Sequence, residues 1–205
     1  MRVNYVVAMV CLTVSAVAQD EAAKPKVSKD PLTAEQIAVY RAVLQGYTNG
    51  SDNLLNVANK TEPLDQSEPF FGKSCMSGIE LETADASVPV VHQLDPSVAP
   101  SKKFILVDPD RQAQRVKEND PQKLMTRAID GHEKVTEKQM DDSVKQAFET
   151  GLFTLTEIVF DKQHRYAVVA YSFVCGGLCG HGNTLILEKV GQDWKVSKRC
   201  GGWIS

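Results

Sequence analysis

The sequence lacks a long apolar run that could cross a membrane. Its longest apolar stretch, from Val6 to Val17, is shorter than the roughly 20 residues that a spanning helix needs, and no second run of that length follows. Concentrated positive charge is lacking too, because 23 Lys and Arg residues are interspersed with 26 Asp and Glu residues, for a formal net charge of −3. We therefore expect neither a membrane span in the mature protein nor nucleic acid binding, which needs a basic face.

Short motifs of common enzymes are also missing. The chain has no Gly-x-Ser-x-Gly elbow of serine hydrolases and no His-Glu-x-x-His helix of metalloproteases. His92, His132 and His164 lie in separate polar stretches without a partner at ligand or triad spacing, and we interpret them as solvated loop residues. These absences favour a non-catalytic protein, and the sequence indicates no cofactor.

The first eighteen residues have the order of a cleavable signal peptide. Arg2 precedes the apolar stretch, and the small-residue triplet Ala16-Val17-Ala18 stands ahead of Gln19. Cys11 could indicate a lipid-modified cysteine instead, but a lipoprotein site has a small residue where this chain has Val10. We expect export to the periplasm or secretion, with residues 1–18 removed.

The remaining chain predicts a leader followed by one domain. Residues 19–31 hold almost no large apolar side chain, which is typical of disorder. Residues 32–205 suffice for a single hydrophobic core. A first helix should begin at Thr33, which forms a capping-box pattern with Gln36, and should end near Gly46.

The middle of the chain should be irregular. Prolines recur between Thr61 and Lys103, and a long regular element cannot form there. Short strands are expected within 54–58, 88–91 and 104–107, and helical pieces at 110–117 and 120–129.

A last helix and four strands complete the prediction. Thr136 begins the helix, Met140, Val144 and Phe148 recur every four residues along it, and Gly151 ends it. Extended periodicity follows in four segments joined by short turns, 152–160, 166–174, 184–190 and 194–198. Because short turns permit only antiparallel neighbours, we predict an α+β fold in which this helix packs on a C-terminal four-stranded antiparallel meander.

Four cysteines remain after signal removal, and an even number in an exported chain indicates disulfides. Three connectivities are open to them. If the strands at 166–174 and 184–190 form a hairpin, Cys175 and Cys179 lie in its loop, within the Cα distance that a disulfide requires. Cys75 would then pair with Cys200 and attach the proline-rich middle to the sheet.

Other functions are conceivable for the same segment, from Cys175 to Gly182. Cys175, Cys179, His181 and Cys200 could form a tetrahedral zinc site, or the two nearer cysteines a redox pair. Its glycines, Gly176, Gly177, Gly180 and Gly182, could wrap an anion in backbone amides. An oxidising compartment and the unusual spacing disfavour the zinc hypothesis, and the absence of a helix at this segment disfavours the redox and anion-binding hypotheses. We favour a tight cross-linked turn, with Gly176, Gly177, Gly180, His181 and Gly182 as a candidate binding loop.

Aromatic residues near the predicted strands admit two interpretations. Trp194, Trp203, Tyr171 and Phe173 could form a binding face. Aromatic side chains dominate the buried surface of small β-rich cores, so we favour core packing, with Tyr171 and Phe173 on one side of their strand.

The C-terminal quarter resembles a known group of proteins. Cys175-Gly-Gly-Leu-Cys-Gly-His-Gly182, Leu187-Glu-Lys, Trp194-Lys-Val and the terminal Trp203-Ile-Ser are similar to the tail of a family of uncharacterised exported bacterial proteins. The resemblance covers roughly residues 150–205. It implies a bacterial envelope or secreted setting and brings no activity or cofactor. It also implies that the short bridge is a unit of its own, because the family often has that pair without the long one.

The sequence as a whole predicts an exported, disulfide-stapled domain that serves as a non-catalytic binding or envelope-structural module. The alternative is a metal-binding or thiol-redox protein that uses the cysteine-histidine cluster. Substrate and partner are not indicated.

Overall fold

A computed structural model of the chain describes residues 24–47, 54–64, 75–82, 89–99, 101, 103–131 and 134–205. The fold is α+β, as expected. Its helices are α1 (Ala34–Tyr47), α2 (Pro109–Glu118), α3 (Pro121–Ile129), α4 (Glu137–Thr150) and the short 3₁₀ helix η1 (Pro96–Val98). Its strands are β1 (Lys26–Val27), β2 (Leu55–Ala58), β3 (Val90–Val91), β4 (Phe104–Val107), β5 (Leu152–Leu155), β6 (Val159–Phe160), β7 (Tyr166–Gly176), β8 (Cys179–Val190) and β9 (Asp193–Ile204). The predicted signal peptide, residues 1–18, and His132 lie outside the described residues.

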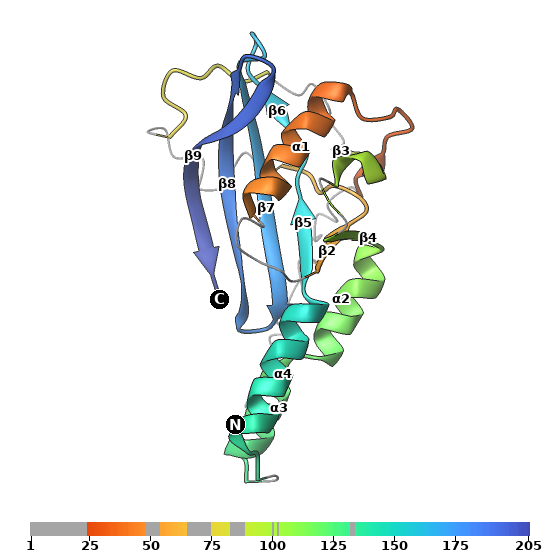
Figure 1. The fold of residues 1–205 in the computed structure, drawn as a ribbon, viewed down its shortest axis with the longest axis vertical. Coiled ribbons are helices and arrows are strands. Elements are labelled where there is room, and N and C mark those ends of the chain that lie inside the picture. Colours follow the sequence, from red (N-terminus) through yellow and green to blue (C-terminus); the bar gives the residue numbers. More distant parts are fainter. Residues whose placement is uncertain are drawn as a thin grey trace, which may run out of the picture.

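Within the described residues, seven strands form a mixed sheet in the order β4-β2-β5-β7-β8-β9, with β6 also paired to β7 (Figure 1). Strands β5, β7, β8 and β9 are antiparallel neighbours. The predicted four-stranded sheet is nevertheless too small, because β2 and β4 extend it in parallel beside β5. Long connections separate these strands from β5 in the sequence, so local turn patterns could not reveal their pairing.

Both predicted capping boxes are present. At α1, the Gln36 N–H donates to Thr33 Oγ1 at 3.1 Å, and the Thr33 N–H donates to Gln36 Oε1 at 2.8 Å. Thr136 and Gln139 make the same reciprocal contacts at the start of α4. These bonds satisfy backbone donors that the first turn of a helix leaves unpaired, so short sequence patterns located both helix starts.

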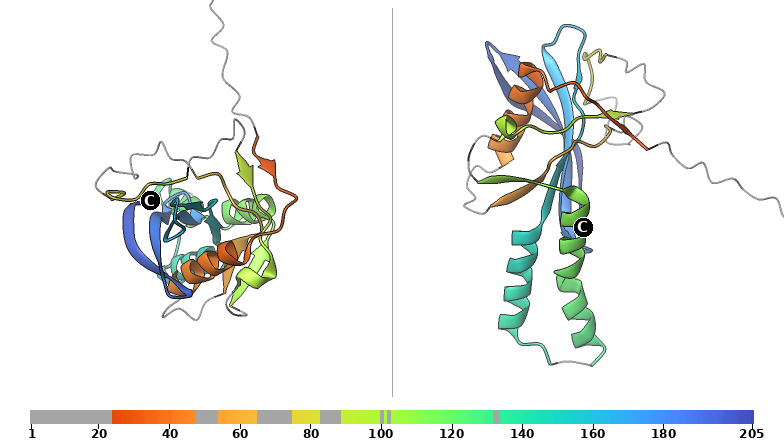
Figure 2. Two further views of the ribbon diagram at one scale, coloured as in Figure 1. Left: turned by 90° about the horizontal axis from the view of Figure 1, so that it is seen from above. Right: turned by 90° about the vertical axis from the view of Figure 1, so that its right-hand side faces the viewer.

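Helix α1 lies against one face of the sheet (Figures 1 and 2). Its inward side, Val39, Tyr40, Val43 and Leu44, is buried. The facing sheet residues in the same core cluster include Val57, Phe153, Leu155, Val169, Tyr171, Phe173, Leu185 and Leu187. The main hydrophobic core is therefore between α1 and this face.

The opposite face of the sheet has a smaller apolar cluster. Val168 and Ile186 are fully buried there beside Cys200, which is 1% exposed. The segment from Cys75 to Glu82 covers them, and its Met76, Ile79 and Leu81 pack against the cluster. This cover reaches only part of the face.

Helices α2, α3 and α4 extend past one end of the sheet as a helical arm (Figures 1 and 2). Ala58, Val116 and Leu152 pack together where the arm joins the sheet. The Gln112 side chain donates to the carbonyl of Thr150 at 2.6 Å and links α2 to the end of α4. No helix in the described ranges is both long and apolar enough to cross a membrane.

The predicted apolar face of α4 does not lie on the sheet. Val144 and Phe148 are 39% and 49% exposed, and Ala147 is the buried residue of this helix. Because α4 runs away from the sheet, only its last turns reach it, where the Phe148 ring stacks on Phe173 with 6.1 Å between centroids. The expected packing of this helix was wrong over most of its length.

The predicted disordered leader contains ordered backbone. Lys26 and Val27 form β1, which pairs in parallel with β3. The Lys26 N–H donates to the Pro89 carbonyl at 2.9 Å, and the Ser28 N–H donates to the Val91 carbonyl at 2.8 Å. Backbone pairing requires no apolar side chain, so composition did not reveal it. The ordered chain therefore begins before residue 32.

Candidate functional site

The four cysteines pair as the sequence predicts. Cys175 is bonded to Cys179 with a Cα–Cα distance of 5.1 Å, and Cys75 to Cys200 with a distance of 5.7 Å. The short bridge closes the hairpin of β7 and β8. The long bridge attaches the segment that covers Val168 and Ile186 to strand β9.

The alternative zinc cluster does not assemble. Each cysteine of the proposed set is in a disulfide, and the bridge of Cys200 leads to Cys75 on the opposite face from His181. Across the part of the chain that the structure describes, no three His, Cys, Asp or Glu side chains are placed to hold a metal ion. The metal hypothesis therefore loses the geometry on which it depended, whereas the Cys175–Cys179 disulfide is also the oxidised form of a thiol-redox pair.

The candidate binding loop is largely not a loop. Strand β7 continues to Gly176 and β8 begins at Cys179, so only Gly177 and Leu178 lie between them. The Gly177 N–H donates at 3.0 Å to the carboxylate of Asp120, the capping residue of α3. A carboxylate of the protein already occupies this amide, which argues against an anion-binding turn.

Gly180, His181 and Gly182 belong to β8, where successive residues point to opposite faces of the sheet. His181 points toward α1 and lies among aromatic rings of Tyr47, Tyr171 and Phe173, with centroids 5.7 to 6.1 Å from its own. Its Nε2 lies 3.2 Å from the Tyr47 hydroxyl. His181 therefore lies on the opposite face of the sheet from Gly180 and Gly182, with which it was grouped in the predicted binding loop.

Burial shifts the pKa values of His181 and of its hydrogen-bond partner Tyr47 in opposite directions. Burial, with a smaller effect of Tyr171, raises the pKa of Tyr47 to about 12. Burial lowers the pKa of His181. Both groups are therefore neutral near pH 7, and the phenol can donate to an unprotonated Nε2. This arrangement stabilises the end of α1 against the sheet.

The glycines of β8 lie on the other face, under Trp203. A Cβ at Gly182 would be 2.4 Å from the indole Nε1, and one at Gly180 would be 3.0 Å from the indole Cζ3. Only residues without a side chain allow the indole to lie this close to the strand. Trp203 itself is 38% exposed.

A single row across four strands builds the floor of a groove on this face. Thr154 of β5 pairs with Ser172 of β7, Ser172 with Gly182 of β8, and Gly182 with Trp203 of β9. Strands lie about 4.8 Å apart, so Thr154 and Gly182 are roughly 10 Å apart. The groove has a volume of about 370 Å³, and its lining includes Glu62, Leu64, Thr154, Ser172, Gly182, Thr184 and Trp203.

Glu62 forms the wall opposite Trp203. Its backbone N–H donates to the Leu155 carbonyl at 2.9 Å, which holds it beside β5. The Thr154 hydroxyl donates to Glu62 Oε2 at 3.5 Å and lies 2.8 Å from the Ser172 hydroxyl. A chain of hydroxyls therefore runs from the floor of the groove to the carboxylate.

The charge of Glu62 is only partly compensated. Burial raises its pKa, while the Thr154 hydroxyl and the charge of Lys60 lower it by less. Lys60 itself forms an ion pair with Asp110 at 3.5 Å. In the described part of the chain Glu62 has no ion pair of its own.

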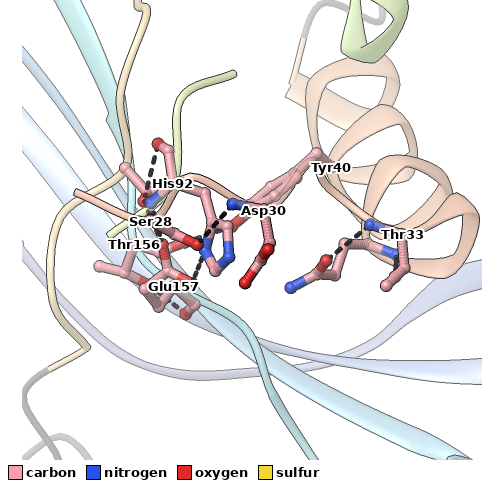
Figure 3. Close-up of polar contacts among 9 residues, drawn as sticks. Ser28, Asp30, Thr33, Tyr40, His92, Thr156 and Glu157 are labelled. Atoms are coloured by element: carbon pink, nitrogen blue, oxygen red, sulfur yellow. Dashed lines mark hydrogen bonds and ion pairs between the residues drawn. The ribbon is translucent and has the colours of Figure 1, made fainter. Parts of the chain in front are cut away.

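Two of the three histidines that we interpreted as solvated have carboxylate partners. His92 Nδ1 lies 2.9 Å from Glu157 Oε2, and the His92 N–H donates to Glu157 Oε1 at 2.8 Å (Figure 3). The hydroxyl of Thr61 donates to the same Oε1. His164 lies between two acids, with its Nδ1 2.8 Å from Glu35 and its Nε2 3.3 Å from Glu82. The interpretation was wrong for His92, whose side chain is 17% exposed, and missed only the acidic partners of His164, whose side chain is 44% exposed. These partners are remote in the sequence.

The His92–Glu157 pair resembles the carboxylate-imidazole pairs that orient catalytic histidines. Figure 3 shows it beside Asp30, and backbone bonds from the Thr61 N–H to the His92 carbonyl and from the Leu94 N–H to the Asn59 carbonyl join the chain after β3 to the chain after β2. His92, Glu157 and Thr61 do not line the groove. The network therefore ties the β1–β3 ribbon to the sheet and is separate from the candidate site.

Sequence reasoning found only part of this site. It identified Gly180 and Gly182 but assigned them to a loop, and it favoured core packing for all four aromatic residues. Tyr171, Phe173 and Trp194 are 7%, 4% and 6% exposed, so the core interpretation is confirmed for them and wrong for Trp203. Glu62, Thr154 and Ser172 were missed. The available signal was the Gly-x-Gly spacing, which in a strand leaves one face bare.

Comparison of the chain with models of known families, with curated proteins and with solved structures finds no match. The resemblance to an exported bacterial family therefore stays a prediction.

Proposed function

We propose that the protein is a non-catalytic binding module that takes a small organic molecule into the groove between Glu62 and Trp203. The observation that carries this proposal is the row from Thr154 to Trp203, in which the indole lies over the glycines of β8 and the hydroxyls of Thr154 and Ser172 follow beside it. An exposed indole, hydroxyls and one carboxylate converge there on a volume of about 370 Å³. Small-molecule sites combine an apolar surface with a few placed polar groups in this way.

Two observations support binding over catalysis. All four cysteines of residues 24–205 are in disulfides, which leaves no thiol nucleophile among them. The carboxylate-oriented imidazole of His92 lies outside the groove. Neither of these candidate catalytic groups can therefore act on a ligand bound beside Trp203.

Export to an oxidising compartment is part of the proposal. Two disulfides are typical of secreted and periplasmic proteins. The signal-peptide pattern predicts a mature chain that begins at Gln19, and the intact mass of the exported protein tests this. A mass that includes residues 1–18, or a lipid, would contradict it.

A panel of sugars, amino acids and small amines, scored by thermal shift and tryptophan fluorescence, tests the binding function. The informative variant is Gly182→Ala, whose Cβ would be 2.4 Å from the Trp203 indole and 2.8 Å from the Tyr171 carbonyl oxygen, and a thermal melt establishes that this variant is folded. Gly46→Ala is the matched control, since a Cβ there meets open space. A compound that acts on the wild type and on Gly46→Ala but not on Gly182→Ala supports the proposal.

Trp203→Ala provides a second variant, because Trp203 is partly exposed and its removal leaves the main core intact. Compounds that act equally on the wild type, Gly182→Ala and Trp203→Ala would refute the groove as the binding site. A panel in which no compound acts on the wild type would count against the binding function itself.

A further inference from the structure

The groove presents one unbalanced charge. As far as the described residues go, its lining contains the carboxylate of Glu62 and no Lys or Arg side chain. Lys60, whose charge lowers the pKa of Glu62, forms its ion pair with Asp110 at 3.5 Å. Among the described residues Glu62 has no ion pair, and an ammonium group of a ligand would supply one.

The opposite wall suits the carbon frame of such a ligand. The Trp203 indole offers it a partly exposed aromatic face. Trp203 is fixed against Gly180 and Gly182, so its other surface is available to a ligand. Among the described lining residues, an anion would find no basic side chain.

We propose that the groove selects a small organic ammonium, whose N–H groups donate to the carboxylate of Glu62 while its carbon frame lies against Trp203. This inference rests on the proposed binding function of the groove and names the chemical class of its ligand. The hydroxyls of Thr154 and Ser172, which lie between the two walls, can bond a hydroxyl of the ligand. Glu62 thereby determines specificity for charge, and Trp203 supplies the contact surface.

Two matched compounds test the charge preference by titration calorimetry. 4-Aminocyclohexanol and cyclohexane-1,4-diol share a ring and a hydroxyl and differ in an ammonium group for a hydroxyl group. We expect the wild type to bind the amine about tenfold more tightly, as charge-assisted hydrogen bonds are stronger than neutral ones. Glu62→Gln should lose this preference.

Glu80→Gln is the control, because Glu80 is an exposed acid that pairs with Lys162 outside the groove. It should keep the full preference for the amine. Trp203→Ala should weaken both compounds, and thermal melts establish that each variant is folded. If Glu62→Gln does not fold, the reduced binding of both compounds by Trp203→Ala and the preference in the wild type carry the test.

The outcomes separate the two proposals. Equal binding of amine and diol, or an amine preference that survives in Glu62→Gln, would overturn the ammonium inference and leave groove binding intact. If neither compound binds while the panel yields another ligand that Gly182→Ala abolishes, the ammonium inference is wrong and the binding function stands. If neither binds and no panel compound binds, both are wrong.

Discussion

Breaking the Cys75–Cys200 bridge should cost this protein far more stability than breaking the Cys175–Cys179 bridge. The bridged residues are 125 positions apart in the first case and 4 in the second. In the chain-entropy account, a disulfide stabilises by restricting the unfolded chain, and the restriction grows with the loop that it closes. For these loops it gives about 5 kcal/mol and about 2 kcal/mol.

The packing around the long bridge adds to this difference. Cys200 is 1% exposed and lies in the cluster of Val168 and Ile186, which the segment from Cys75 to Glu82 covers. Among the described residues, two backbone bonds hold that segment to β6 and the chain after it, from the Glu82 N–H to the Phe160 carbonyl at 2.8 Å and from the Lys162 N–H to the Glu80 carbonyl at 3.2 Å. Without the bridge the cover can open, so part of the loss should appear as exposed apolar surface.

Urea unfolding of two double variants measures the difference. Cys75→Ala with Cys200→Ala should lose 2 to 5 kcal/mol, on the order expected for a long native bridge. Cys175→Ala with Cys179→Ala should lose about 2 kcal/mol or less. Mass spectrometry under non-reducing conditions confirms that the other bridge is intact in each variant. A larger loss for the short bridge, or equal losses, would refute the view that the long bridge anchors the cover of the sheet.

Three further predictions concern single residues. A hydrogen bond with Glu35 raises the pKa of His164 above 6.5, so the protonated His164 should stabilise the fold fully below pH 6.5, and this stabilisation should be lost as the pH rises through the folded-state pKa. Thermal melts across this pH window should show a fall in melting temperature that is absent in His164→Gln. His181→Ala should destabilise by about 1 to 2 kcal/mol in urea, because it removes a ring from an aromatic cluster and the partner of the Tyr47 hydroxyl. Thr136→Ala should cost about 1 kcal/mol by the same assay through the lost cap of α4, and an unchanged midpoint would contradict the capping role.

Features specified by nearby residues could be predicted from the sequence. The caps at Thr33 and Thr136 depend on a partner three residues away, and both are present. The short bridge follows from a hairpin with glycines between its cysteines, and the long one then follows because two cysteines remain. The caps and the short bridge depend on residues close in the sequence, and the long bridge is the only pairing left once the short one is assigned.

The site could not be predicted because it depends on the register of strands far apart in the sequence. Thr154, Ser172, Gly182 and Trp203 form one row only once β5, β7, β8 and β9 are aligned. A shift of one residue would exchange His181 for Gly182 on the groove face. Treating residues 175–182 as a loop discarded this alternation.

The acid–histidine pairs could not be predicted either, because their members are far apart in the sequence. Glu157 and His92 are 65 residues apart, and Glu35 and His164 are 129 apart. No spacing rule connects such pairs, since the main sheet and the β1–β3 ribbon bring them together only in the folded chain. The exposed Val144 and Phe148 escaped prediction for a related reason, because periodicity indicates an apolar face but not what covers it.

Two-dimensional NMR of the ¹⁵N-labelled protein can locate a ligand on the sheet face between Glu62 and Trp203. During titration with 4-aminocyclohexanol, we expect the largest chemical-shift changes at the Trp203 indole N–H and at the backbone amides of Gly182 and Thr184. Resonances of His181 and its aromatic neighbours on the other face should change little. Changes centred on His181, or none at the Trp203 indole, would show that the groove is not where the ligand binds.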